Sequence, residues 1–426
     1  MAYRILSLDG GGTWALIEVR ALIKLYGADA TGHEVLRDFD LVAANSGGSL
    51  VLGGLIEDMK LQDLLNCFKD PVKRRSLFPP SLCYGTRLLH VLTGLGPKYS
   101  TKRKLTSIQT LLPKTGNKPL AAAVAGLRGA GGANLHVLIV GFDYDRCRAV
   151  YFRSATAYGT TNLGVGAATR ATLAQAIHAS TNAPVNYFDA PARFPGHNER
   201  YWDGGLTGNN NPVLAAVTEA AVLEQRPEDV IALSLGTGSV FLPMPAPGTA
   251  LSTYETPRKP TSLVRDLKKL ALAILDDPPD AASFHVHVMT GSGSNLPSPA
   301  VSRLVRMNPL LSPVRDTEGQ WAPPGGMSGE EFLTLCDLGM DALAQDEVDR
   351  IGRLADLWLV DKVRNQPIRL NGSTLDAEIG YESFGAARAG WEALTGTAPT
   401  KTMKTGTKKK PKATARPTKK ARRKKR

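Results

Sequence analysis

The sequence has few cysteines, and their spacing indicates neither a metal site nor a disulfide framework. Its 426 residues include four cysteines, Cys67, Cys83, Cys147 and Cys336, which are far apart and have no histidine at metal-ligand spacing. Structural zinc sites use closely spaced Cys and His pairs, and small disulfide scaffolds are dense in cysteine. We therefore expect reduced thiols, no metal and no other cofactor.

Long hydrophobic runs are also absent. No uninterrupted apolar stretch approaches the ~18 residues that a membrane-spanning helix requires. A strand pattern begins almost at the first residue, which leaves no room for the charged and apolar regions of a signal peptide. We therefore expect a cytoplasmic protein, whose only contact with a membrane is peripheral, on its inner face.

Acidic residues are missing from the end of the chain. Residues 401–426 contain 14 Lys or Arg and no Asp or Glu, whereas the rest of the chain has 38 basic and 39 acidic residues. The formal charge of +13 therefore belongs to this segment. Without apolar periodicity, residues 398–426 are predicted to form a disordered Lys/Arg-rich tail. Such a tail attracts anionic lipid surfaces or nucleic acid, although it has no aromatic side chain to stack on bases.

Two strand–loop–helix units near the start predict a parallel α/β sheet. Residues 3–8 form a buried strand pattern that leads through Asp9-Gly10-Gly11-Gly12 into a helical pattern ending at Gly27. Residues 39–44 form a second strand pattern, which leads through Asn45-Ser46-Gly47-Gly48 into a helix ending near Asp58. Further strands are expected at 135–142, 149–153 and 230–235, and helices at 172–179 and 213–224.

These elements predict one α/β body with a mostly parallel central sheet flanked by helices. We expect a core at residues 1–240 and a continuation of the same body at 241–397. Residues 77–133 are rich in Pro, Gly and Lys, and residues 241–260 in Pro and Thr. Both are predicted to be long insertions near the site, and each could act as a lid.

Ser46 is the candidate nucleophile, because it lies in a turn between a strand and a helix. The segment from Ala44 to Gly48 matches the G-x-S-x-G elbow, with Ala in place of the first Gly. The sharp turn needs small residues at both ends, and Ala is the least costly departure. The helix start also favours a developing anion. Taken alone, the pattern is more often a plain helix cap.

Two further glycine motifs could complete such a site. Acyl transfer places negative charge on an oxygen, and the N–H groups of Gly10, Gly11 and Gly12 could converge on it as an oxyanion hole. Asp203, followed by Gly204 and Gly205, offers a carboxylate on a turn that allows close approach to a serine. The alternatives are a turn that begins a helix and an ordinary Asp-Gly turn.

The histidines do not fit a conventional triad. His178 and His197 precede Asp203, whereas the α/β-hydrolase order is Ser, Asp, His. After Asp203 only His285 and His287 remain, in a stretch without a turn signature. Asp203 is therefore the preferred base, although a triad stays open.

Taken together, these motifs resemble the patatin-like phospholipases. That family joins a D-G-G-G loop, a G-x-S-x-G elbow and a D-G-G or D-G-A motif, which correspond here to residues 9–12, 44–48 and 203–205. Weaker landmarks are residues 179–184 before Tyr187-Phe188, and residues 231–238. The resemblance implies the patatin-like three-layer fold and a Ser–Asp dyad of Ser46 and Asp203. It also implies a phospholipid or other lipid ester as substrate, hydrolysed without a metal.

The sequence departs from the family pattern at three places. Trp14 and Ala15 stand where the family usually has Arg and Gly, so a role of that Arg in the oxyanion site is not carried over. Ala44 replaces the first Gly of the elbow. The Asn209-Asn210-Asn211-Pro212 segment has one Asn more than the usual ending of the Asp motif.

Two other classes of protein remain open from the sequence. Residues 9–13 also resemble the phosphate loop of ATP-binding, actin-like sugar kinases, in which the chain continues into a second strand as a hairpin. The basic tail alone could define a non-enzymatic anion-binding protein, with peripheral membrane contact through residues 401–426 or binding of nucleic acid. For a lipid hydrolase, the membrane surface is the simplest partner of the tail.

Overall fold

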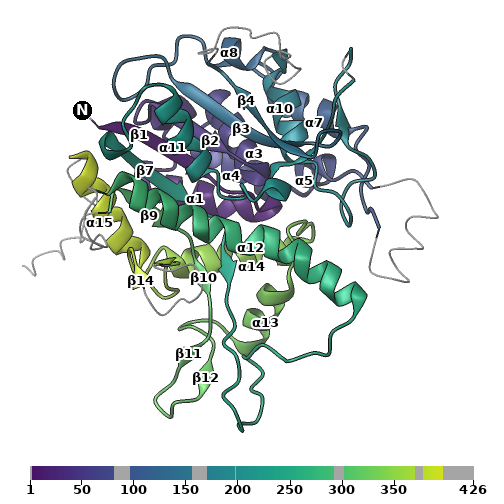
Figure 1. Cartoon of the computed structure of the whole chain (residues 1–426), viewed down its shortest axis with the longest axis vertical. Coiled ribbons are helices and arrows are strands. Elements are labelled where there is room, and N and C mark those ends of the chain that lie inside the picture. Colours follow the sequence, from purple (N-terminus) through teal and green to yellow (C-terminus); the bar gives the residue numbers. More distant parts are fainter. Residues whose placement is uncertain are drawn as a thin grey trace, which may run out of the picture.

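A single eight-stranded sheet runs through the molecule (Figure 1). The computed structural model describes residues 2–80, 96–155, 170–196, 198–291, 302–369 and 378–396. The strand order is β5-β6-β3-β2-β1-β7-β9, and β4 also pairs with β3. The strands of this sheet are β1 (Tyr3–Leu8), β2 (Leu41–Ala44), β3 (His136–Asp143), β4 (Arg148–Arg153), β5 (Ala192–Arg193), β6 (Arg200–Asp203), β7 (Val230–Leu235) and β9 (Leu304–Met307).

The predicted mostly parallel sheet is confirmed. Strands β3, β2, β1, β7 and β9 are parallel to one another. Strands β4 and β6 are antiparallel to β3, and β5 is antiparallel to β6. The carboxyl ends of β1 and β2 therefore meet at one edge of the sheet. That edge is where ligands bind in open α/β sheets.

Helices cover both faces of the sheet. On the first face lie α1 (Leu16–Tyr26), α3 (Ser46–Ile56), α4 (Leu61–Lys69) and α10 (Leu173–Ser180), with α14 (Gln345–Trp358) packed on α1. On the second face lie α11 (Val213–Val222) and the long α12 (Leu263–Thr290), which runs across the molecule (Figure 1). The smaller elements are η1 (Gly12–Ala15), α2 (Gly32–Leu36), α5 (Pro71–Leu77), α7 (Lys104–Leu111), α8 (Leu120–Ala123), η2 (Gly204–Thr207), η3 (Pro227–Asp229), β8 (Ser239–Val240), β10 (Leu310–Leu311), β11 (Val314–Arg315), β12 (Trp321–Ala322), α13 (Gly329–Asp337), β13 (Ile368–Arg369), β14 (Glu378–Ile379) and α15 (Phe384–Thr395).

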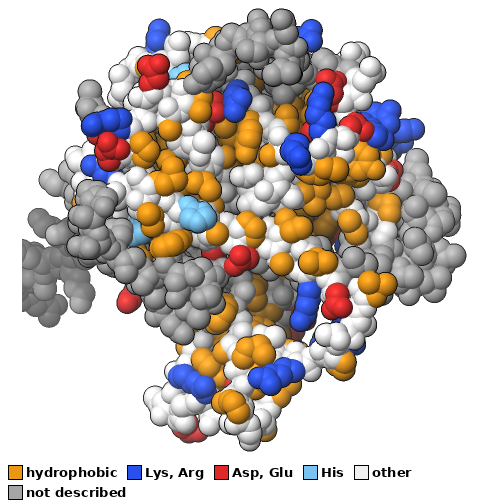
Figure 2. Space-filling view, in the orientation of Figure 1, with side chains coloured by type: hydrophobic (Ala, Val, Ile, Leu, Met, Phe, Trp, Pro, Cys, Tyr) orange, Lys and Arg blue, Asp and Glu red, His pale blue; other side chains and the backbone are white. Residues whose placement is uncertain are grey.

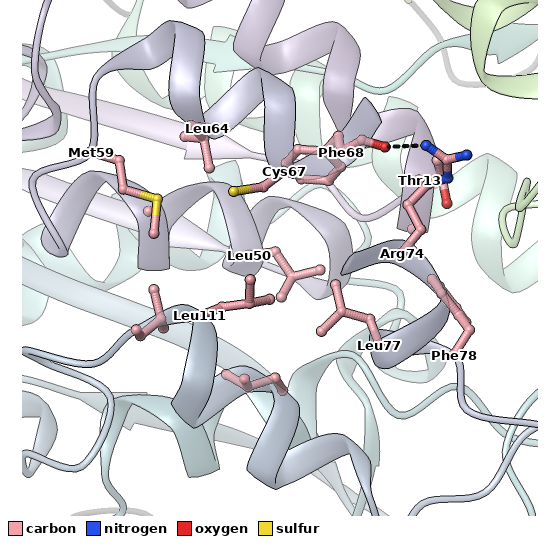
Figure 3. Close-up of a pocket in the computed structure, with 14 residues that line it drawn as sticks. Thr13, Leu50, Met59, Leu64, Cys67, Phe68, Arg74, Leu77, Phe78 and Leu111 are labelled. Carbon is pink, nitrogen blue, oxygen red and sulfur yellow. Dashed lines mark hydrogen bonds between the residues drawn. The ribbon is translucent and has the colours of Figure 1, made fainter. Parts of the chain in front are cut away.

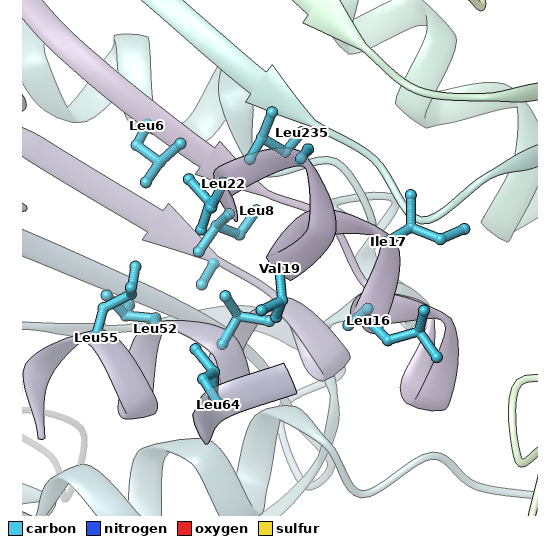
Figure 4. Packing of buried hydrophobic residues seen from close by; sticks show 14 of the residues in the cluster. Leu6, Leu8, Leu16, Ile17, Val19, Leu22, Leu52, Leu55, Leu64 and Leu235 are labelled. Atoms are coloured by element: carbon cyan, nitrogen blue, oxygen red, sulfur yellow. The ribbon is translucent and has the colours of Figure 1, made fainter. Parts of the chain in front are cut away.

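The alternation of side chains along β1 explains these three layers. Leu6 and Leu8 are fully buried against the first face, where they pack near Leu22 of α1 and Leu52 of α3 (Figure 4). Ile5 points to the opposite side and joins the cluster under α11. Because both faces of the strand are buried, it reads as a nearly continuous apolar run.

The structure bears on two interpretations of the sequence. Residues 77–133 are not only an insertion, because α7 packs against α5 and α10 and α8 against α10. The chain after the glycine loop is helical, as η1 and α1, and does not form the hairpin that a kinase-type phosphate loop requires. In the described part of the chain, no helix is both long and apolar enough to cross a membrane, although α12 has 28 residues.

Candidate active site

Ser46 lies at the end of β2 in a strained backbone conformation. Its φ is 44°, in the left-handed region that non-glycine residues rarely adopt. The side chain is buried, with 6% of its surface exposed, and Ser46 is the first residue of α3. Such strain persists only where the surroundings enforce it, and it is the conformation that a nucleophile elbow imposes on its serine.

The elbow is tight on both sides of Ser46. A Cβ on Gly48 would lie 2.5 Å from the carbonyl oxygen of Leu8 and 2.6 Å from that of Asp9. The Gly48 N–H donates to the Asp9 carbonyl at 2.9 Å. Only glycine fits between these backbone groups, which fixes α3 against the end of β1.

The structure brings Asp203 to Ser46 from β6, which is separated from β2 by β3. Asp203 ends β6 and has 6% of its surface exposed. Its Oδ1 accepts hydrogen bonds from the Gly205 N–H at 2.8 Å and from the Asn45 side chain at 3.4 Å. Burial raises the pKa of Asp203, whereas hydrogen bonds from Gly205, the Ser46 side chain and Asn45, and the charge of Lys104, oppose this rise. A carboxylate with a raised pKa is a better proton acceptor than an exposed one.

Residues 180–182, at the C-terminal end of α10, contact both Ser46 and Asp203. The Ser180 hydroxyl accepts the Ser46 N–H at 2.9 Å, and the Asn182 carbonyl accepts the Asp203 N–H at 3.1 Å. Between them, the Thr181 carbonyl accepts a hydrogen bond from the Lys104 ammonium. One short segment therefore sets the position of Ser46 relative to Asp203.

The glycine loop lies beside Ser46, but its three N–H groups are not equivalent. Gly10 donates its N–H to the Asn210 carbonyl at 2.8 Å, so this donor is already used. Within the described chain, the N–H groups of Gly11 and Gly12 have no acceptor, and neither does that of Gly47. Gly12 and Gly47 are adjacent, because a Cβ on Gly47 would lie 2.8 Å from the Gly12 nitrogen. Gly47 is not among the donors expected from the sequence, although the residue after a nucleophile is a usual oxyanion donor.

Two connected pockets open at the site. The smaller one is lined by Ser46, Gly12, Gly47, Lys104, Phe188 and Met340, among others. The larger one lies between α3, α4, α5 and α7, and its lining includes Leu64, Phe68, Ile108 and Leu111 (Figure 3). Both share Gly12, Leu50, Leu77 and Phe78, so the larger pocket continues from the space above Ser46.

The larger pocket is apolar despite Arg74 in its wall. The Arg74 guanidinium donates to the carbonyls of Phe68 at 3.0 Å and Leu343 at 3.1 Å, and to the Gln345 side chain. Figure 3 shows the first of these bonds at the edge of the pocket. Because its Nη1 and Nη2 groups donate to these oxygens, Arg74 joins α5 to the segment before α14.

A buried cluster of charged residues contacts Asp9, at the start of the glycine loop. The Arg306 guanidinium of β9 donates to the Asp9 carboxylate at 2.6 Å and to the Ser234 hydroxyl at 2.8 Å. The Asp9 N–H donates to the Glu18 carboxyl at 2.6 Å. Burial, and then the charge of Asp9, raise the pKa of Glu18 well above its usual range. Burial raises the pKa of Asp9 to about 6, against the lowering effect of Arg306.

The histidines do not approach a triad geometry in the described residues. His178 is buried in α10, and burial, with the charge of Lys104, lowers its pKa to about 3. His287 lies in α12, where its Nδ1 contacts the Ser302 hydroxyl at 2.8 Å. His197 lies outside the described residues. No group of His, Cys, Asp or Glu in the described ranges has the arrangement of a metal site.

The fold and the site together define a class: α/β proteins with a serine on a strand-to-helix elbow and a buried carboxylate beside it. A family model described as patatin-like phospholipase matches residues 6–217. The chain belongs to this family of lipase- and phospholipase-type hydrolases through that domain. The matched range contains the glycine loop, Ser46 and Asp203, whereas Arg306 lies beyond it.

Similarity to individual proteins is weak. Among solved structures, the crystal structure of VipD from Legionella pneumophila matches with 12% identity and a TM-score of 0.32. The match covers 83% of this chain and 67% of that chain. No curated protein matches the sequence.

Proposed function

We propose that this protein hydrolyses lipid esters of the phospholipase A type, with Ser46 as nucleophile and Asp203 as its general base. The observation that carries the proposal is the strained Ser46, held at a φ of 44° near the buried carboxylate of Asp203, whose pKa the Ser46 hydroxyl lowers. A serine hydroxyl is a weak nucleophile until a base removes its proton. In the described part of the chain, Asp203 is the carboxylate in that position.

The proposed reaction has two steps. Ser46 Oγ attacks the ester carbonyl while its proton moves to Asp203, and the N–H groups of Gly11, Gly12 and Gly47 stabilise the oxyanion. Asp203 then returns the proton to the leaving alcohol as the acyl-enzyme forms. Water attacks the acyl-enzyme while one of its protons moves to Asp203. Asp203 then returns this proton to Ser46 Oγ as the bond between Ser46 and the acyl group breaks and the fatty acid is released. Gly10 is left out of the oxyanion hole, because its N–H is used by Asn210.

The larger pocket is the proposed place of the acyl chain. It begins above Ser46 at Leu50 and Phe78 and continues between apolar side chains of α3, α4 and α7. Burial of an acyl chain there contributes about 0.8 kcal/mol per methylene group. A lipid ester therefore fits this site better than a short, polar ester does.

Covalent labelling tests the proposed nucleophile. A fluorophosphonate probe should modify Ser46, as located by peptide mass spectrometry, and Ser46→Ala should lose labelling and ester hydrolysis together. Asp203→Asn should lower kcat/KM on the order of 10⁴-fold while the protein stays folded. Ser49→Ala is the matched control, since Ser49 lies one turn along α3 and donates to the Ser46 carbonyl. Near wild-type hydrolysis by either site variant would sink the proposal.

Residues 401–426 are proposed to hold the enzyme at anionic membrane surfaces. This segment carries 14 Lys or Arg and lies outside the described residues. On the face in Figure 2, basic and acidic side chains are interspersed, so the described body offers no comparable charge there. Deletion of residues 401–426 should abolish sedimentation with phosphatidylglycerol liposomes at low salt and leave hydrolysis of a monomeric ester intact. Liposome binding that is unchanged by the deletion would rule the membrane role out. If the intact protein binds duplex DNA but not liposomes, nucleic acid is the favoured partner of the tail.

A further inference from the structure

Lys104 is a buried cation in the wall of the pocket that contains Ser46. It is the first residue of α7, and only 2% of its surface is exposed. Its side chain lines the smaller pocket together with Ser46 and Gly12. No sequence motif indicates Lys104, because it lies in a Lys-rich stretch far from the three glycine motifs.

The contacts of Lys104 do not balance its charge. The ammonium donates to the Thr181 carbonyl, and it lies 3.8 Å from the centre of the Phe188 ring. An ammonium has three donors, so at least one remains for another acceptor. Among the described residues, no carboxylate forms an ion pair with Lys104. The charge of Asp203 raises the pKa of Lys104, but the Asp203 carboxylate accepts hydrogen bonds from Gly205 and Asn45 and forms no ion pair with Lys104.

A buried charge without a partner is costly, and proteins avoid it unless an anion is supplied. Burial lowers the pKa of Lys104 well below its usual range, and a bound anion would restore the charged form. The rest of the pocket is apolar, with Leu50, Phe78 and Phe188 in its lining. An anion that enters this pocket therefore meets the ammonium beside Ser46.

We propose that Lys104 binds the phosphodiester of a glycerophospholipid whose acyl ester lies at Ser46, and that it makes the site prefer phospholipids to uncharged lipid esters. This inference rests on the proposed function. In a glycerophospholipid, the ester and the phosphodiester are joined by a short glycerol unit, as the neighbouring positions of Ser46 and Lys104 require. Diacylglycerols have the same esters without the anion, and so provide a matched substrate.

A kinetic comparison of these two substrates tests the role of Lys104. The substrates are dioleoylphosphatidylcholine and dioleoylglycerol in the same neutral detergent micelles. Lys104→Gln keeps a donor for the Thr181 carbonyl and removes the charge. It should lower the ratio of kcat/KM for phosphatidylcholine over diacylglycerol about 10-fold or more, because charged hydrogen bonds are the stronger ones. Lys104→Arg should retain most of the ratio, and the exposed Lys102→Gln should leave it unchanged.

Two results would overturn the inference. An equal loss on both substrates would assign Lys104 to the support of Asp203 and residues 180–182, and unchanged hydrolysis of both would leave it without a role in the site. Fluorophosphonate labelling of Ser46 in Lys104→Gln shows that the site is still formed. If the Lys104→Gln protein does not fold, Lys104→Met serves as the second neutral variant.

A binding measurement separates this inference from the proposed function. In the Ser46→Ala background, proteins with and without Lys104→Gln are titrated calorimetrically with lysophosphatidylcholine, monooleoylglycerol and oleate, each below its micelle-forming concentration. Weaker binding of lysophosphatidylcholine alone supports the phosphodiester, whereas a loss confined to oleate assigns Lys104 to the released carboxylate and overturns it. Lys104-dependent binding without hydrolysis by the wild type would reject the enzyme and keep the anion site.

Discussion

Arg306 and Asp9 form a buried ion pair at 2.6 Å, although they are 297 positions apart in the sequence. Asp9 begins the glycine loop, and Arg306 lies on β9, beyond the range matched by the family. The sequence lacks the Arg that usually follows the glycine loop, and Arg306 brings a guanidinium to that loop from another strand. The ion pair therefore fixes the position of Asp9 at the start of the glycine loop.

Loss of Arg306 should destabilise the protein strongly. Arg306→Met leaves Asp9 as an unpaired buried charge, so the free energy of unfolding in urea should fall by about 3–5 kcal/mol. Replacing both partners, as Asp9→Asn with Arg306→Met, should recover part of this loss, because no lone charge remains. The exposed Arg258→Met is the control and should have little effect. A double variant less stable than Arg306→Met would contradict the assigned pair.

Glu18 should make stability depend on pH in a defined direction. Burial and Asp9 raise its pKa in the folded state, so the folded protein holds this proton more tightly than the unfolded chain, whose Glu has a pKa of about 4.3. The stability that this proton contributes is fully present below that pH and is lost as pH rises through the pKa of Glu18 in the folded protein. Glu18→Gln cannot ionise and should raise the melting temperature at pH 7.5 but not at pH 4. The exposed Glu318→Gln should show no such difference, and a Glu18→Gln protein less stable at pH 7.5 would refute the idea.

The pH dependence of hydrolysis should follow Asp203. As the base, Asp203 must be ionised, so kcat/KM should rise with pH through one ionisation that lies above the usual range of an aspartate. His178 has a pKa of about 3 and is neutral at higher pH. His178→Gln should therefore leave the midpoint of this rise in place. A rise that disappears in His178→Gln would indicate a histidine base instead.

Two glycines of α3 should differ in their tolerance of alanine. Gly48→Ala would place a Cβ 2.5 Å from the Leu8 carbonyl oxygen, so α3 must move away from β1 and activity should fall by at least 10-fold. Gly54→Ala meets only the flexible end of Leu64, at 2.4 Å, and the gain in helix propensity of about 1 kcal/mol offsets that contact. Thermal melts and hydrolysis of a soluble ester measure both effects. Equal tolerance of the two substitutions would mean that the elbow is not tightly packed.

The acyl pocket can be tested by filling it. Leu111→Trp adds volume to its wall and should remove room for roughly two methylene groups. At about 0.8 kcal/mol for each, kcat/KM for a palmitoyl ester should fall roughly 10-fold relative to a butyryl ester. Leu111→Met, which conserves volume, is the control. An unchanged chain-length preference would place the acyl chain elsewhere.

Local patterns were sufficient to predict the parts of the site that follow strands directly. The glycine loop and Ser46 come at the ends of β1 and β2, so their short motifs contain both the strand and the turn. Lys104 and Arg306 could not be predicted in this way, because each reaches the site through tertiary packing of α7 or β9. Trp14 and Ala15 signalled that an Arg was missing, but nothing in the sequence indicated that Arg306 contacts the glycine loop.

The hydrogen bonds accepted by oxygens of residues 180–182 limit which sequence changes this segment can accept. Ser46, Lys104 and Asp203 are each held by a different one of three successive residues, two of them through main-chain carbonyls. A change of side chain at Thr181 leaves its carbonyl in place, whereas one inserted or deleted residue would misalign all three contacts at once. The segment should therefore be tolerant of substitution at its centre and intolerant of any change in length.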